Sequence, residues 1–278
     1  MAQKKSRLFP VAFLAAKATL AALKLTNHEG GTLPGFIAEG IDPAFLGDIA
    51  KPEQIVFITG TNGKTTTNNL LNDLLADNGY QTVTNRVGGN ISSGFASSFA
   101  KNATWKGTSK TKLAVMEFDE LSGPRIFPYL QPDILSVTNL FRDTFSRSAT
   151  PDYVFDVMDK GIPASTHLIL NADDMISCRL APQCTHRTYY SIARLAEDTA
   201  EPVGIVSDLT ACPKCGGKLK WDYAHLRHLG HATCEECGYT NPTPDYEVIS
   251  VEPETGKFVV KEHCHEGAPT YEYKLNSY

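Results

Sequence analysis

Residues 55–67 read IVFITGTNGKTTT, and this stretch decides which fold the chain can adopt. Its apolar, β-branched first half predicts a buried strand, and the half that begins at Gly60 predicts a glycine loop leading into a helix. Glycines let backbone N–H groups approach a phosphate closely, and the start of a helix adds a partial positive charge. Lys64 can reach the β- and γ-phosphates of a nucleotide, and the Thr65 hydroxyl can bind Mg²⁺. The stretch therefore predicts a nucleoside triphosphate site, with a glycine turn that binds nothing as the alternative.

The match to the general phosphate-loop pattern G-x-x-x-x-G-K-T is incomplete. Ile58 stands where that pattern has its first glycine. The sequence TGTNGKTT at residues 59–66 is a narrower signature for the same chemistry. The residues that we expect to contact ATP in this loop are Gly60, Thr61, Asn62, Gly63, Lys64, Thr65 and Thr66.

Composition limits the kinds of protein that this chain can be. Its 278 residues are 42% hydrophobic and 21% charged, which is typical of a soluble globular protein with one large domain or two smaller ones. A net charge of −5 argues against nucleic-acid binding as the main function. The sequence has seven cysteines and no recognisable secretory signal, so we expect a cytoplasmic protein in which clustered cysteines bind metal.

Residues 8–25 (LFPVAFLAAKATLAALKL) are predicted to form a helix. Pro10, Lys17 and Lys24 interrupt the apolar stretch, which is too short to predict a membrane span. Two alternatives remain open for this helix: it packs on the protein, or it lies on a membrane surface with its lysines reaching the headgroups. Residues 30–35, which are rich in glycine, are expected to form a loop.

Apolar strands alternate with helical segments through the middle of the chain. Most of these strands are apolar on both faces, which predicts an α/β fold with a mostly parallel sheet flanked by helices. Ligands bind such sheets at the carboxyl ends of the strands. Because Gly60, Glu117, Asn139 and Asn171 all lie at such ends, we expect them to form one site. Strands are expected at residues 81–84, 112–118, 132–139, 166–170 and up to Tyr190, and helices at 65–78, 91–101 and 152–161.

Acidic residues follow the strand predicted at 112–118, namely Glu117, Asp119 and Glu120. A carboxylate that ends a strand beside a phosphate loop commonly orders Mg²⁺ or the attacking group. We therefore expect Glu117 to hold Mg²⁺ together with Thr65. A solvated charged loop is the alternative.

Two C-x-x-C pairs occur late in the chain, separated by 18 residues. Four thiolates at this spacing predict a closed, tetrahedral and structural zinc site, and redox-active pairs or free thiols are the alternatives. The predicted zinc ligands are Cys212, Cys215, Cys234 and Cys237. Between the pairs we expect solvated loop histidines at His225, His228 and His231, and a small apolar face made by Leu219, Trp221, Leu226 and Leu229.

Three antiparallel strands are predicted after the cysteine module, at residues 246–251, 257–261 and 271–275. The predicted organisation of the whole chain is an N-terminal helical segment at 1–50, a central ATP-binding domain at 51–207, a zinc-ribbon insertion at 208–243 and a β segment at 244–278 that completes the central domain.

Several of these landmarks resemble the Mur ligase family, the ATP-dependent amide-forming enzymes of peptidoglycan synthesis. Residues 59–66 resemble its ATP loop, and Glu117 resembles its magnesium-binding glutamate. Residues 139–143 resemble the asparagine-to-aspartate stretch of the family, and NADD at 171–174 resembles the element that contacts adenine and ribose. The resemblance implies the central-domain fold of a Mur ligase, with ATP and Mg²⁺ as cofactors. It also implies catalytic roles for Lys64, Glu117 and Asp143, and nucleotide contacts for Asn139, Asn171, Asp173 and Asp174.

The zinc-ribbon insertion narrows the resemblance to the MurT branch of this family, which residues 31–35 and 117–120 also resemble. That branch implies a carbon–nitrogen ligase of cell-wall biogenesis. Its subunit amidates the α-carboxylate of D-glutamate in lipid II, through an acyl phosphate, with ammonia from a GatD-type glutaminase partner. The lipid-linked substrate implies work at the inner face of the plasma membrane. Proteins of this branch carry a further C-terminal domain, which we expect this chain to lack.

The sequence also departs from the family pattern. Thr144 stands where most Mur ligases have a histidine. The carbamylated lysine of the amino-acid-adding branch falls near Met158, and Lys160 is only a neighbour. This difference argues against the first alternative function, a Mur-type or folylpolyglutamate-type amino-acid ligase. The second alternative is a nucleotide-binding scaffold that is active only in a complex. The third, a nucleic-acid-binding zinc ribbon, is disfavoured because the module has no consistently basic face.

Overall fold

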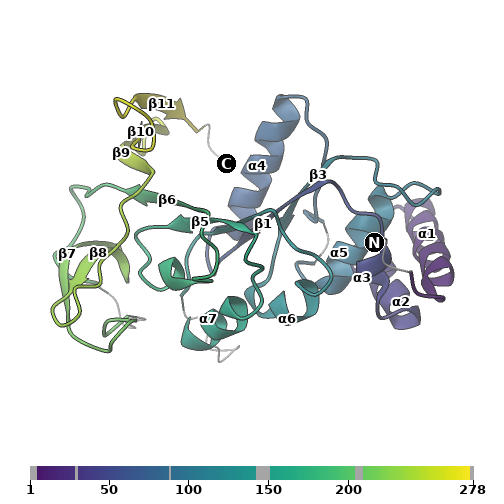
Figure 1. The fold of residues 1–278 in the computed structure, drawn as a ribbon. Coiled ribbons are helices and arrows are strands. Elements are labelled where there is room, and N and C mark those ends of the chain that lie inside the picture. The colour runs from purple at the N-terminus through teal and green to yellow at the C-terminus, as the bar shows by residue number, and fades with distance from the viewer. Residues whose placement is uncertain (1–4, 29–30, 88, 142–150, 204–208, 276–278) are drawn as a thin grey trace. The chain divides into compact units, whose positions relative to one another are not determined.

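The computed structural model describes residues 5–28, 31–87, 89–141, 151–203 and 209–275. Its helices and strands are drawn in Figure 1. The chain divides into two compact units. Unit 1 consists of Met1–Ser136 and Asp156–Thr166, and unit 2 consists of Val137–Phe155 and His167–Tyr278.

The strands of unit 1 are parallel, as the apolar pattern predicts. β1 (Gln54–Thr59) pairs with β3 (Leu113–Glu117), and β3 pairs with β2 (Thr82–Val83). β4 (Ile134–Val137) starts in unit 1, and its last residue belongs to unit 2. In β1 and β3 almost every side chain is at least partly buried, which explains why both strands read as continuous apolar runs.

The helices predicted at residues 8–25, 65–78, 91–101 and 152–161 are present, whereas the short helical segments at residues 120–126 were not predicted. The expected loop at residues 30–35 is wrong at its C-terminal end, because α2 already begins at Leu33. A proline in the first turn of a helix costs no hydrogen bond, so Pro34 favours this start. The helices that lie wholly or partly in unit 1 are α1 (Phe9–Leu25), α2 (Leu33–Ile41), α3 (Phe45–Asp48), α4 (Lys64–Asp77), α5 (Ser92–Asn102), the 3₁₀ turn η1 (Glu120–Ser122), α6 (Gly123–Ile126) and α7 (Pro151–Asp159).

A cluster of phenylalanines forms the centre of the unit 1 core. The Phe57 ring stacks on Phe118 with centroids 5.6 Å apart, and Phe95 meets Phe57 edge to face at 5.1 Å. Phe127 extends the cluster at 5.1 Å from Phe118. Because Phe57 lies on β1 and Phe118 directly follows β3, this packing fixes the two strand ends that carry the candidate site.

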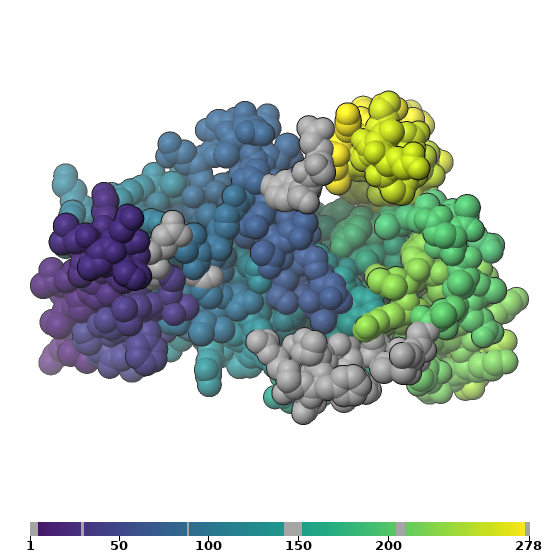
Figure 2. Space-filling model, turned by 180° about the vertical axis from the view of Figure 1, so that it is seen from behind, coloured from purple at the N-terminus to yellow at the C-terminus, as the bar shows by residue number. Residues whose placement is uncertain are grey.

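Helix α1 packs on the protein through Phe9, Ala12 and Ala16, which confirms one of the two expectations for it. Val11 and Leu14 lie on another face of the helix and are 58% and 60% exposed. The N-terminal helices stand at the surface of unit 1, in purple in Figure 2. Within the described part of the chain, no helix combines the length and the apolar character that crossing a membrane requires.

Unit 2 contains a sheet that is parallel at one end and antiparallel at the other. β5 (His167–Asn171), β6 (Arg187–Ile192) and β9 (Tyr246–Glu252) are parallel, whereas β10 (Lys257–Glu262) and β11 (Thr270–Lys274) continue as antiparallel strands. The predicted C-terminal strands are thus confirmed, and β6 extends two residues beyond the predicted end at Tyr190. β7 (Leu219–Leu226) and β8 (Leu229–Cys234) form a separate hairpin, and η2 (Ser177–Arg179) follows β5.

Candidate functional site

The loop between β1 and α4 has the backbone geometry of an anion site. Gly60 and Gly63 have φ angles of 126° and 82°, a region that side chains other than glycine rarely adopt. Gly63 is the N-cap of α4, and no side chain caps the helix there. The N–H groups of the first turn therefore face outward, where they can bind phosphate. Thr61 and Asn62 lie in this loop, and Thr65 and Thr66 are exposed in the first turn of α4.

Lys64 is held at the mouth of this loop by two acceptors. Its ammonium donates to the carbonyl oxygen of Gly60 at 2.9 Å and lies 3.4 Å from Oε1 of Glu120. The same carboxylate oxygen accepts the N–H of Gly60 at 3.1 Å. Burial raises the pKa of Glu120, and the charge of Lys64 opposes that shift. The Glu120 carboxylate thus binds both a loop amide and the loop lysine, which are the groups expected to bind a phosphate.

Thr65 and Glu117, the predicted magnesium ligands, contact each other. The Thr65 hydroxyl donates to Oε2 of Glu117 at 2.7 Å, and the Asn90 amide donates to the other carboxylate oxygen at 3.1 Å. Asn85 exchanges two 2.8 Å hydrogen bonds with the backbone of Glu117. A hydroxyl and a carboxylate this close form the oxygen-rich set that Mg²⁺ prefers, so the residues fit the ion.

Asn85 and Asn90 are functional candidates that the sequence analysis did not identify. Both lie between β2 and α5, and both orient Glu117 from this segment. The signal that could have identified them is a pair of asparagines beside consecutive glycines, directly after a predicted strand.

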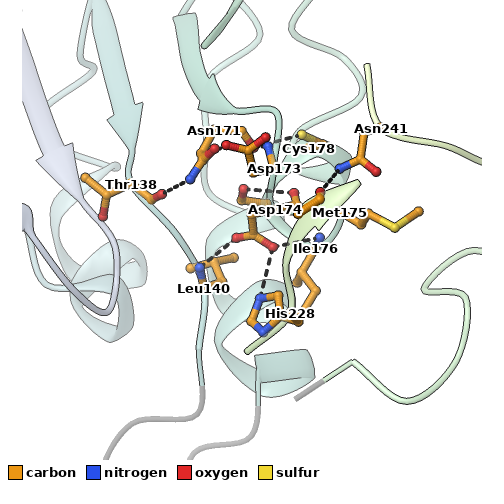
Figure 3. A network of polar contacts seen from close by, with 12 residues as sticks. Thr138, Leu140, Asn171, Asp173, Asp174, Met175, Ile176, Cys178, His228 and Asn241 are labelled. Atoms are coloured by element: carbon orange, nitrogen blue, oxygen red, sulfur yellow. Dashed lines mark hydrogen bonds and ion pairs between the residues drawn. The ribbon is translucent and has the colours of Figure 1, made fainter. Parts of the chain in front are cut away.

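In unit 2 the NADD element is the centre of a buried polar network (Figure 3). The Asn171 amide donates to the carbonyl oxygen of Thr138 at 3.0 Å, which links the segment after β4 to the end of β5. Asp174 accepts backbone N–H groups from Leu140 at 2.8 Å and Ile176 at 2.9 Å. The Asp174 side chain is fully buried and positions the residues after β4, and its predicted contact with the nucleoside stays a prediction.

Asp173 connects the same element to β6 and to the hairpin. Its carboxylate accepts the N–H of Ile192 at 2.9 Å, and its carbonyl oxygen accepts the N–H of Gly230 at 2.9 Å. Burial raises the pKa of Asp173 to about 6. Asn241 strengthens the connection by donating to the carbonyl oxygens of Ala172 at 2.6 Å and Gly230 at 3.0 Å.

The prediction of solvated loop histidines is wrong. His228 is 1% exposed, packs on the Phe141 ring at 4.5 Å and lies 3.3 Å from Oδ1 of Asp174. His225 and His231 lie on the strands of the hairpin, where each ring contacts a carboxylate. The expected apolar face is also incomplete, because Leu226 is 63% exposed.

The other predicted site residues are divided between the two units. Gly60 and Glu117 belong to unit 1, whereas Asn139 and Asn171, each 8% exposed, belong to unit 2. The expectation that these strand ends form one site stays a prediction. Asp143 and Thr144 lie outside the described residues.

The four predicted zinc ligands form a compact cage of sulfur atoms within 4.8 Å of one another. The Sγ atoms of Cys212 and Cys237 are 3.7 Å apart, and those of Cys215 and Cys234 are 3.5 Å apart. A tetrahedron with Zn–S bonds of about 2.3 Å has edges of about 3.8 Å, so the cage fits zinc. These short distances join sulfurs of different C-x-x-C pairs, which favours a metal site over two redox-active pairs.

The backbone around the cage also suits thiolates. Lys214, Gly217 and Cys237 each direct a backbone N–H at a ligand sulfur over 3.4 Å. The glycines that follow the two pairs have φ angles of 78° and 68°, as expected for turns whose N–H groups point at sulfur.

Comparison with known proteins agrees with this geometry. The Mur ligase middle domain matches residues 58–207. The chain is 36% identical over 241 residues to the lipid II isoglutaminyl synthase (glutamine-hydrolyzing) subunit MurT of Staphylococcus aureus strain COL, covering 84% of this chain and 53% of that protein. It is 34% identical to subunit MurT of Streptococcus pneumoniae, covering 80% of this chain and 49% of that protein. These matches confirm the predicted resemblance to the MurT branch.

The fold is similar to a solved structure, a pseudomurein peptide ligase type C from Methanothermus fervidus. The TM-score is 0.59 at 24% identity, over 84% of this chain and 44% of that one. The chain spans about half the length of the curated relatives it matches. Because the middle-domain match covers more than half of its residues, this chain belongs to the Mur ligase family.

Proposed function

We propose that this chain supplies the ATP-binding part of a lipid II isoglutaminyl synthase. The observation that carries the proposal is the 36% identity to MurT subunits together with the phosphate loop, in which Lys64 lies at the start of α4. The proposed reaction converts the α-carboxylate of D-glutamate in the stem peptide of lipid II to an amide. A carboxylate is a poor acylating agent, so the reaction needs activation by ATP.

In the proposed reaction a carboxylate oxygen of the substrate attacks the γ-phosphorus of ATP, and ADP leaves. Ammonia then attacks the carbonyl carbon of the acyl phosphate, loses a proton, and inorganic phosphate leaves. We assign the supply of ammonia to a GatD-type glutaminase partner, because the matched relatives are named as subunits of a glutamine-hydrolyzing enzyme.

The residues of the loop have separate tasks in this reaction. Lys64 exchanges its contacts with Gly60 and Glu120 for the γ-phosphate and stabilises the charge that develops there. Thr65 and Glu117 would hold Mg²⁺, which would neutralise phosphate charge. Asn85 and Asn90 keep Glu117 in place. Asn139, Asn171 and Asp173 are assigned to the nucleoside, and Asp174 positions the residues after β4.

The amino-acid-adding alternative is less well supported by the described residues. Met158, which lies nearest by spacing to the carbamylated lysine of that branch, is fully buried in α7. Lys160 is exposed and lies beyond the end of α7. A carbamate on Lys160 would therefore stand in solvent, where little would fix its position.

The decisive experiment is lipid II amidation with ATP, using the whole protein and its glutaminase partner. We expect Lys64→Ala to lower the rate by at least about 100-fold, because the ammonium stabilises charge mainly in the transition state. Circular dichroism serves as the fold control. Undiminished amidation by Lys64→Ala would remove the loop from the mechanism, and transfer of an amino acid instead of ammonia would favour the amino-acid-ligase alternative.

We further propose that the protein works at the inner face of the plasma membrane, because its proposed substrate is lipid-linked. The exposed apolar side chains of Val11 and Leu14 on α1, and of its N-cap residue Leu8, support this location. In a liposome flotation assay with anionic lipid, we expect Val11→Ser together with Leu14→Ser to reduce the floated fraction several-fold. Equal flotation of the variant and the unchanged protein would end the membrane-surface proposal.

A further inference from the structure

A pocket of about 660 Å³ lies in unit 1, away from the phosphate loop. Helix α1, the segment that follows β2, and α5 form most of its walls. None of residues 59–66 lines it. Its cationic lining residues are Lys17, Lys24, Arg86, Lys101 and Lys110.

The pocket concentrates positive charge in a chain whose net charge is −5. Five of its described lining residues are lysine or arginine, and none of the described lining residues is acidic. Like charges that share a pocket repel one another, and a pocket lined by one sign of charge focuses the field on ligands of the opposite sign. Burial, and to a smaller extent the proximity of Lys110, lowers the pKa of Lys17.

Several of these cations are held in place by other parts of unit 1. Lys17 donates to the carbonyl oxygen of Ala103 at 2.5 Å, and Lys110 donates to the carbonyl oxygen of Lys101 at 3.3 Å. Arg86 forms an ion pair with Asp73 at 2.7 Å, which orients its guanidinium and offsets part of its charge, so the four lysines supply most of the positive charge of the pocket. A guanidinium and ammonium groups that are already oriented lose less conformational entropy when they bind an anion.

The rest of the lining indicates what the anion is attached to. Leu20, Leu23 and Val87 provide apolar surface, and Ser97 and Ser98 lie on α5. A pocket that joins a cluster of cations to apolar side chains suits an amphipathic ligand with a charged end. Arginine and lysine together are typical of phosphate recognition.

We propose that this pocket binds the phosphate or diphosphate group of a ligand, with the apolar side chains contacting the portion next to that group. The site is distinct from the proposed ATP site and does not depend on that assignment. A phosphate or diphosphate group can belong to two kinds of ligand, a free phosphate compound or a lipid-linked diphosphate. The experiment compares both kinds.

The experiment is calorimetric titration with inorganic diphosphate and with farnesyl diphosphate, performed in a Lys64→Ala background to suppress binding at the phosphate loop. The pocket variant combines Lys24→Gln with Lys101→Gln, both exposed side chains. The control variant combines Lys106→Gln with Lys112→Gln, which are exposed lysines of unit 1 outside the pocket and remove the same charge. Circular dichroism verifies that both variants fold.

We expect the pocket variant to bind diphosphate about tenfold more weakly than the control variant, since two charge-assisted contacts are lost. Tighter binding of farnesyl diphosphate than of inorganic diphosphate identifies a lipid-linked source, and equal binding identifies a free one. Equal affinities of the pocket and control variants, or no diphosphate binding once Lys64 is replaced, would overturn the proposal.

Discussion

The ammonium of Lys64 and the carboxylate of Glu120 lie 3.4 Å apart, and both are largely buried. Glu120 also accepts the N–H of Gly60. Its carboxylate thus occupies two donors, the Gly60 N–H and the Lys64 ammonium, that could otherwise bind a phosphate. A negative charge beside an anion site lowers the affinity of that site unless the charge moves or is neutralised. Glu120 is therefore expected to compete with the nucleotide for Lys64.

Replacement of Glu120 tests this competition directly. Glu120→Gln keeps the size of the side chain and an oxygen that can accept the Gly60 N–H, but it removes the charge. We expect an ATP analogue to bind about fivefold more tightly, which corresponds to roughly 1 kcal/mol. Calorimetric titration measures the change, with Glu53→Gln on the exposed surface as the control. Weaker binding by Glu120→Gln would mean that this carboxylate contributes favourably to nucleotide or Mg²⁺ binding.

At the scale of elements, the contact between α2 and α5 is unusually close. Gly35 donates its backbone N–H to the Ser97 hydroxyl at 2.8 Å. A Cβ atom on Gly35 would lie 2.0 Å from the carbonyl oxygen of Ser93 and 2.8 Å from the backbone nitrogen of Ser97. Backbone atoms of a packed helix cannot move aside without moving the whole helix, so this position requires glycine.

The matched pair Gly35→Ala and Gly40→Ala tests this contact within one helix. We expect Gly35→Ala to lower the free energy of unfolding by about 1–3 kcal/mol or more, because it overpacks the contact between the helices. At Gly40 a Cβ meets nothing within 4 Å, so alanine there is expected to stabilise the protein by up to about 1 kcal/mol. Urea unfolding followed by circular dichroism compares the two. Similar effects of both substitutions would contradict the close packing.

At the scale of the whole molecule, the two candidate centres belong to different units. The phosphate loop and Glu117 lie in unit 1, and the cysteine cage lies in unit 2. The cage joins the segment before β7 to the end of β8 and the turn that follows it. Because a short hairpin buries little apolar surface, a metal would supply much of the stability of this segment.

Cys212→Ser should lower bound zinc from about one ion per chain to nearly none, since zinc needs all four thiolates for a closed site. The hairpin should then become sensitive to protease, while ATP binding by unit 1 persists. Elemental analysis and limited proteolysis measure the two effects. Cys264→Ser, at an exposed cysteine outside the cage, is the control. Stoichiometric zinc in the Cys212→Ser variant would show that the ligand set is wrong.

The amino-acid sequence alone determined those features of the protein that depend on residues close together in the chain. The phosphate loop, the alternation of strands and helices and the four-cysteine spacing are all set within a few residues or at fixed intervals, so they were predictable. Only the tertiary structure decided that Glu120 holds Lys64, that Gly35 belongs to a helix packed on α5, and that His228 is buried against Asp174. These partners are far apart in sequence, 56 residues for Lys64 and Glu120 and 62 for Gly35 and Ser97. Contacts over such separations follow from packing, which no local pattern records.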